Sequence, residues 1–150
     1  MKTIPFFQEA LRFALPVILT GCAGAGPELS YNLIGGEIRQ PLSSIAPDAE
    51  RGRKVLVSRD SNCILCHAAP ETGERFFGNL APPLSGTGKR LTAGQMRARI
   101  VDPLYFNPQS IMPAYYRVKG LNRVAESYRG KPVLSAEQIE DVIAYLLTLK

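Results

Sequence analysis

Two cysteines and a histidine close together in the sequence carry the strongest chemical signal of this chain. Cys63, Cys66 and His67 follow the pattern C-x-x-C-H. Two thiols at this spacing can each add across one vinyl group of the same porphyrin, and the adjacent histidine then supplies a neutral imidazole nitrogen to the iron. The pattern is typical of the attachment site of a c-type haem. We therefore predict one covalently bound haem c.

Other uses of a C-x-x-C pair fit the chain less well. A redox dithiol normally lies in a βαβ context and does not need the following histidine. A structural zinc ion would need two further ligands, whereas the sequence holds only three cysteines and one histidine. A chance occurrence of the pattern is the third alternative. Covalent haem is the interpretation adopted.

The single histidine limits what can bind the other face of the iron, because it excludes a second histidine ligand from this chain. Met112 precedes Pro113 in a proline-stiffened loop and is the predicted second ligand, giving a His/Met-ligated iron with a raised reduction potential. Met96 falls in an expected helix, where it would fill the core. A lysine or Cys22 would be the alternative ligand.

The N-terminus has the features of an export signal over residues 1–21. It carries two basic residues and an apolar core at residues 13–19 that is too short for a membrane-spanning helix. The sequence Leu-Thr-Gly-Cys ending at Cys22 resembles a bacterial lipobox, so Cys22 would be lipidated. The alternative is ordinary signal-peptidase cleavage after residues 23–25. Either route leads to the periplasm, with or without a lipid anchor to a membrane.

Charge gives no sign of a nucleic-acid partner. The formal net charge is +5, and no run of five or more basic residues occurs. Such an excess is typical of a solvated surface and is compatible with an acidic protein partner.

Three helices are expected to position the haem. Acidic residues in a first turn favour a helix over residues 47–59, which leads straight into the haem turn, and Gly52 would mark a close crossing by another helix. Capping-box patterns at Thr92 and Ser135 open the other two helices. The last helix has an apolar face at helical spacing, with Tyr145 beside it and packed over Gly52.

The connecting segments are expected to be irregular. Residues 22–46 are rich in Gly, Pro and Ser and predict an extended arm, either a flexible tether or a strap that packs on a partner subunit. Residues 71–89 read as a loop with little regular structure. Residues 113–134 form a long, basic link that would cover the haem edge or face a partner.

Three residues in these loops are candidates for supporting the haem. The Pro82 carbonyl would accept the second N–H of His67, although a plain polyproline turn is the alternative. Tyr115 and Tyr116 would wall the haem, or serve only as ordinary core. The predicted fold is all-α, with residues 47–150 forming one helical domain around the haem.

In chain order, these features resemble the class I cytochromes c. A larger set of segments resembles the SoxX family, the small haem subunits of the SoxAX cytochromes of bacterial thiosulfate oxidation. The segments are Arg51-Gly52, Asn62 to His67, Gly78 to Leu84, Arg99 to Asp102, Asn107-Pro108, Met112 to Arg117 and Leu134 to Val142.

The resemblance implies an electron-transfer role within a heterodimeric L-cysteine S-thiosulfotransferase, with no catalytic residues in this chain. A SoxA-like partner would join thiosulfate oxidatively to a cysteine of a SoxYZ-like carrier protein. This chain would take up the electrons through its His67/Met112 haem and pass them to a soluble cytochrome c. The lipobox departs from the usual soluble form of the family.

Two other functions stay open. One is a free-standing, lipid-anchored cytochrome c that shuttles electrons. The residues 22–46 and 113–134 favour the subunit, because a monomeric shuttle needs neither segment. The other is a haem-based sensor or peroxidase, which needs an open or labile axial site.

Overall fold

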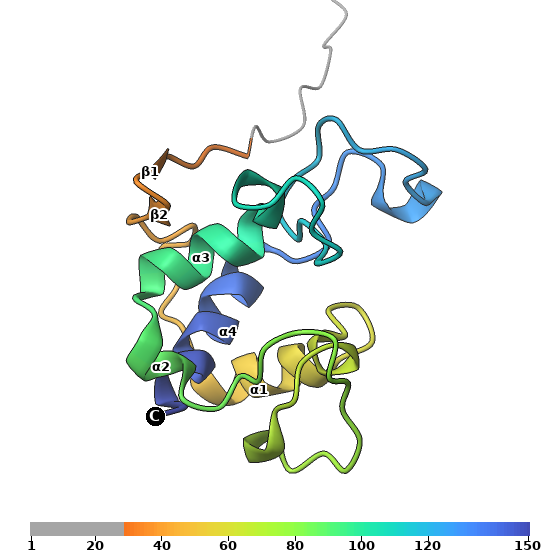
Figure 1. The fold of residues 1–150 in the computed structure, drawn as a ribbon. Helices are drawn as coiled ribbons and strands as arrows, with labels where there is room; N and C mark the ends of the chain where they lie inside the picture. The colour runs from red at the N-terminus through yellow and green to blue at the C-terminus, as the bar shows by residue number, and fades with distance from the viewer. Residues whose placement is uncertain (1–28) are drawn as a thin grey trace, which may run out of the picture.

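The computed structural model describes residues 29–150, so Cys22 and the expected export signal lie outside the described residues. Four α-helices form the domain, and several short 3₁₀ turns and one small hairpin complete it (Figure 1). The α-helices are α1 (Ala49–Val57), α2 (Thr87–Arg90), α3 (Ala93–Val101) and α4 (Ala136–Thr148). This is the all-α fold that the sequence predicted. None of the described helices is both long and apolar enough to span a membrane.

The two helices α1 and α4 cross in direct backbone contact at Gly52. A Cβ atom built on Gly52 would lie 1.9 Å from the main-chain oxygen of Asp141 in α4. The predicted close crossing is therefore present, and the α4 backbone itself lies against Gly52. Tyr145 is buried on α4, and its packing over Gly52 stays a prediction. The Arg51 guanidinium, one residue earlier, reinforces the crossing with two 2.8 Å bonds to the Asp141 carboxylate.

Both capping boxes form where the sequence predicts them. Thr92 accepts from the N–H of Gln95, whose side chain accepts from the N–H of Thr92, and Ser135 and Gln138 repeat the arrangement in α4. The helices therefore start at fixed positions, since each box satisfies two N–H groups that the first turn leaves without partners. The α4 residues facing the core include Ile139, Val142, Ile143 and Leu146.

The described part of the expected arm is folded onto the domain. Strands β1 (Leu33–Ile34) and β2 (Glu37–Ile38) pair as an antiparallel hairpin around Gly35 and Gly36, both at positive φ. Ile38 is only 1% exposed. The hairpin packs mainly against α3.

A buried ion pair fixes this hairpin to α3 and α4. Arg97 of α3 and Glu140 of α4 form two short bonds, of 2.6 and 2.7 Å, and both side chains are buried. Arg97 also donates to the carbonyl of Ile38 at 2.6 Å, and Glu140 accepts from the N–H of Leu42 at 2.9 Å. The segment that composition favoured as an independent arm is therefore held by charge-assisted hydrogen bonds at two points.

Residues 71–89 are more ordered than the expected loop. A 3₁₀ turn at Pro70–Thr72 and helix α2 interrupt it. Helix α2 packs on α4, where the N–H of Gly88 donates to the carbonyl of Leu149 at 2.8 Å. Between them, residues 74–83 have no regular element apart from an isolated bridge between Ala81 and His67 of the cysteine turn.

Candidate functional site

A cavity of about 550 Å³ opens at the centre of the domain, between α3 and α4 on one side and the Cys63 turn on the other. Its walls are mostly apolar. Cys63, Cys66, His67 and Met112 all line it, so the cavity collects four residues that the sequence selected from two distant segments. A volume in this range is typical of pockets that enclose a small organic cofactor. A cavity with two thiols and one imidazole in its wall fits a covalently bound porphyrin.

The turn that presents the cysteines is built by local hydrogen bonds. Asn62 takes a left-handed backbone conformation with φ of 48°, which asparagine tolerates better than most residues. Its N–H donates to the carbonyl of Ser58 at 2.8 Å, which ties the turn to the end of α1. The 3₁₀ turn Cys63–Leu65 follows, and the N–H of His67 closes it on the carbonyl of Cys63 at 3.0 Å. The two thiols and the imidazole therefore enter the cavity from one compact loop.

The His67 ring is held in one orientation by the neighbouring segment. Its Nδ1 lies 2.7 Å from the carbonyl oxygen of Pro82. Because a carbonyl can only accept, Nδ1 carries the proton and Nε2 keeps its lone pair for a metal. A hydrogen bond of this kind fixes the tautomer and raises the basicity of the ligating nitrogen.

The segment that carries Pro82 is aligned on the cysteine turn by main-chain bonds. Gly78 donates to the carbonyl of Ile64 at 2.8 Å, and Ala81 donates to that of Cys66 at 3.0 Å. A Cβ atom on Gly78 would lie 1.9 Å from the carbonyl oxygen of Leu65. The glycine therefore permits the close approach on which the position of the Pro82 carbonyl depends.

Two methionines line the same cavity, from different elements. Met96 lies on α3 and is only 2% exposed, as expected for a residue that fills the core. Met112 lies in the loop after α3, half-buried, and its N–H donates to the hydroxyl of Ser110 at 3.2 Å. The loop position leaves the Met112 thioether less enclosed by the core than that of Met96.

The two candidate tyrosines have different surroundings. Tyr115 lines the cavity, and its hydroxyl donates to the carbonyl of Ser61, just before the cysteine turn. Burial raises the pKa of the Tyr115 phenol, so the ring stays neutral and keeps this bond at physiological pH. Tyr116 is also buried, but it is not among the residues that line the cavity, and its ring centre lies 6.5 Å from that of Tyr31.

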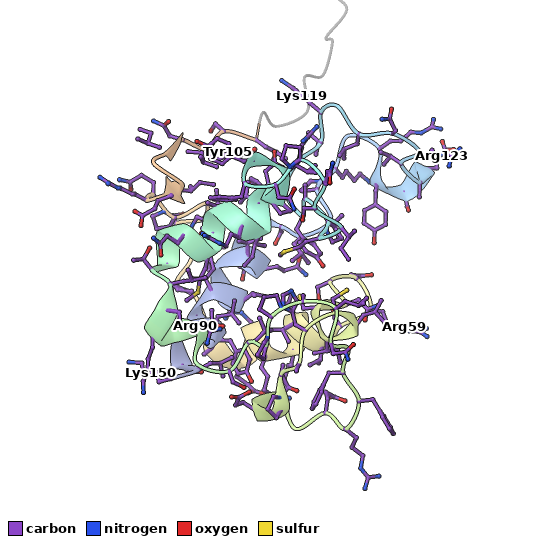
Figure 2. All side chains as sticks on the ribbon, in the orientation of Figure 1. Arg59, Arg90, Tyr105, Lys119, Arg123 and Lys150 are labelled. Atoms are coloured by element: carbon purple, nitrogen blue, oxygen red, sulfur yellow. The ribbon has the colours of Figure 1, made fainter. Side chains whose placement is uncertain are left out.

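Two arginines in the cavity wall were missed by the sequence analysis. Arg90, the last residue of α2, donates to the carbonyls of Ser85 and Pro83, at 2.6 and 3.0 Å (Figure 2). Arg99 of α3 lies with its guanidinium 4.5 Å from the ring centre of Phe106. Haem carries two propionates, and guanidinium groups are well suited to bind carboxylates. These two side chains could therefore hold the propionates.

Only one of these arginines had a usable signal in the sequence. Arg99 lies three residues after Met96, so the two side chains share one face of the expected helix. A charged residue on an apolar helix face is informative, because such positions normally face a core. Arg90 belongs to a short helix that packing on α4 supports, and nothing local marked it.

A sequence family described as cytochrome c matches residues 49–150. The solved structure "Crystal structure of SoxXA from P. pantotrophus" is similar with a TM-score of 0.73 and 32% sequence identity. The match covers 80% of this chain and 94% of that chain. No curated protein sequence matches the chain.

Proposed function

Because the chain belongs to the cytochrome c family and is a class I cytochrome close to SoxX, we propose that it is the electron-transfer subunit of a SoxAX-type complex. In this proposal the chain accepts electrons released during thiosulfate oxidation and passes them on. The single observation that carries the proposal is the cavity that presents Cys63, Cys66 and a tautomer-fixed His67 together.

The residues around the cavity have distinct roles in holding the cofactor. Cys63 and Cys66 bind the covalently attached haem c, and Nε2 of His67 is free to bind its iron. We assign the second axial position to Met112, because its loop places a thioether in the same cavity. When bound, the haem supplies a one-electron iron couple, and thioether ligation favours the reduced form.

The cavity lining supports electron transfer rather than substrate chemistry. Among the described residues that line it, there is no carboxylate and no lysine that could act as a general base. An iron bound by both His67 and Met112 would have no open position for a substrate. The protein contribution is therefore to attach the cofactor, exclude water from it and set its potential.

The sulfur chemistry would take place on a second, SoxA-like subunit. There, a new S–S bond would form between the terminal sulfur of thiosulfate and a cysteine thiol of a SoxYZ-like carrier protein. Forming this bond releases one proton and two electrons. This chain would take the electrons one at a time through its haem, and a soluble cytochrome c would accept them. The name of the similar structure, SoxXA, supports a two-subunit assembly.

We further propose that the complex works in the periplasm, with Cys22 as the lipid-modified anchor. The support is the sequence pattern at residues 1–22. Mass spectrometry of the mature protein would report the haem mass, the cleavage site and any acyl chains together. A mature chain that begins after residue 25 without an acyl group would refute the anchor and leave the electron-transfer proposal intact.

Purification of the full chain from the cells that make it tests the subunit proposal. We expect a stable one-to-one complex with a second c-type cytochrome, and thiosulfate-dependent reduction of this haem only when that cytochrome and the carrier protein are present. A haem-loaded monomer that never associates with a second cytochrome would instead support a free-standing electron shuttle.

A further inference from the structure

One segment of the chain leaves the helical domain and returns without joining its core. We call residues 117–133 the basic lobe. In Figure 1 the lobe projects from the upper right of the molecule, away from α1 and α2. Its base is closed where the N–H of Leu134 donates to the carbonyl of Tyr115 at 3.1 Å. Both Tyr115 and Leu134 are buried and line the haem cavity, so the lobe begins and ends at the cavity wall.

The lobe buries none of its own side chains. Every residue from 117 to 133 is half-buried or exposed, and the only regular element is the 3₁₀ turn Glu126–Tyr128. Four apolar side chains instead line an open hollow of about 380 Å³ in the lobe: Val118, Leu121, Val124 and Tyr128. None of these four side chains is fully buried by the described part of the chain.

Charge in the lobe is strongly one-sided. It contains five cationic residues and a single carboxylate, that of Glu126: the cations are Arg117, Lys119, Arg123, Arg129 and Lys131. Arg117 is used within the fold, with Asp102 at 3.5 Å and the carbonyl of Lys119 at 2.9 Å. The ion pairs found across residues 29–150 do not include Arg123, Arg129 or Lys131.

Two of these cations stand at the rim of the hollow. Arg123 and Arg129 both line it, and Arg123 takes a left-handed conformation with φ of 57°. Figure 2 shows Arg123 at the far end of the lobe. A non-glycine residue in this region of backbone space costs conformational energy. This cost suggests that the direction in which the Arg123 side chain projects has a function. A hollow that combines exposed apolar side chains with two guanidinium groups is complementary to an acidic protein surface that also carries an apolar side chain.

We propose that the basic lobe is the docking surface for an acidic patch on the partner haem subunit. The inference rests on the proposed function, because that function supplies the partner. A permanently bound subunit would cover the apolar side chains of the hollow, which the described residues of this chain leave partly exposed. A transient electron acceptor needs only a small contact area. Because Tyr115 and Leu134 connect the lobe to the cavity wall, a subunit seated there lies beside the haem cavity.

The test uses the full haem-loaded chain and the SoxA-type subunit of the same organism. One variant reverses three lobe charges: Arg123→Glu, Arg129→Glu and Lys131→Glu. A matched control reverses three exposed charges outside the lobe: Lys54→Glu, Lys89→Glu and Lys150→Glu. Lys150 lies at the opposite end of the molecule from Arg123 (Figure 2). The Kd of the complex would be measured at low and high salt, with the absorption spectrum of the free chain as a check on its haem.

The lobe variant should bind the partner subunit more than about tenfold more weakly than wild type, and the control by less than about threefold. The Kd of the wild type should rise with salt, and that of the lobe variant should rise much less. Equal affinities of the lobe variant and the wild type would overturn the proposal. So would a lobe variant that keeps the partner but reduces a soluble cytochrome c more slowly, because the surface would then belong to the acceptor.

The experiment also separates this proposal from the proposed function. A wild-type chain that forms no complex refutes the subunit role itself, whereas a wild-type complex that the lobe variant also forms refutes only the docking surface. If the lobe variant fails to fold, hydrogen exchange of the wild-type chain, measured alone and in the complex with its partner subunit, tests the docking surface instead. The amides of residues 117–133 should exchange more slowly in the complex, and protection confined to other residues would overturn the docking surface.

Discussion

Replacing Gly52 by alanine tests the contact between α1 and α4 on which the domain is built. The added Cβ atom would lie 1.9 Å from the Asp141 oxygen, and real Cβ atoms are essentially never closer than 3.0 Å to such an atom. Because both partners are helix backbone, neither can rotate away. The two helices must therefore separate locally by about 1.1 Å.

The cost follows from that separation. A gap of about 0.5–1 Å loses roughly a quarter to a half of the attraction between the facing atoms. Overpacking of this kind typically costs about 1–3 kcal/mol, and the rigid backbone on both sides favours the upper end. Alanine gains about 1 kcal/mol over glycine in helix propensity. We expect a net destabilisation of about 2 kcal/mol, which corresponds to a fall in Tm of roughly 8 °C.

Denaturant unfolding of the haem-loaded protein, followed by circular dichroism, would measure the change. Gly94→Ala in α3 is the matched control, because its Cβ atom would lie 3.3 Å from the Ile38 oxygen. We expect that variant to change the unfolding free energy by less than about 1 kcal/mol. If Gly52→Ala instead raised stability by the amount that helix propensity predicts, the argument from close backbone contact would be wrong.

Three further predictions test the remaining parts of the site and its support. Met112→Ala should keep the haem attached and lower its reduction potential, whereas Met96→Ala should mainly cost about 2–5 kcal/mol of stability; an unchanged potential in the first would exclude Met112 as a ligand. Arg97→Met leaves the Glu140 carboxylate buried without its cation and should cost about 3–5 kcal/mol in urea unfolding. Adding Glu140→Met should recover part of that loss, and strictly additive losses would mean that the pair is not coupled. The main-chain hydrogen bond at the start of α1 lowers the pKa of Asp48 from its ordinary value of 3.8, so the stabilisation by this carboxylate is complete above that pH and is lost as the pH falls through the lowered pKa. Asp48→Asn should therefore lose less stability than wild type below about pH 4, and parallel acid-unfolding curves would contradict this.

The sequence predicted the features that local chemistry decides. The capping boxes at Thr92 and Ser135 fixed the starts of α3 and α4, because each box is complete within four consecutive residues. The C-x-x-C-H turn predicted the covalent haem for the same reason, since its three reactive groups are almost adjacent. The crossing at Gly52 was also predictable, because a glycine inside a helix signals close approach.

Features that depend on distant segments were not predictable in the same way. The pairing of Arg97 with Glu140 had no local signal, because only the fold brings two residues 43 positions apart into one buried pair. The hairpin at Gly35 and Gly36 did have a signal, a Gly-Gly pair flanked by apolar residues, but the surrounding composition favoured an arm. Whether Met112 binds the iron stays a prediction that the proposed substitutions test.

The clamp of Arg97 and Glu140 on the hairpin has a mechanical consequence. Any pull on the chain ahead of the hairpin reaches the carbonyl of Ile38 and the N–H of Leu42 before it reaches α1. Both points are held by the same buried pair, so the load passes sideways into α3 and α4. Tension on the N-terminal segment is therefore borne by the buried ion pair, and α1 and the cysteine turn that follows it are left undisturbed.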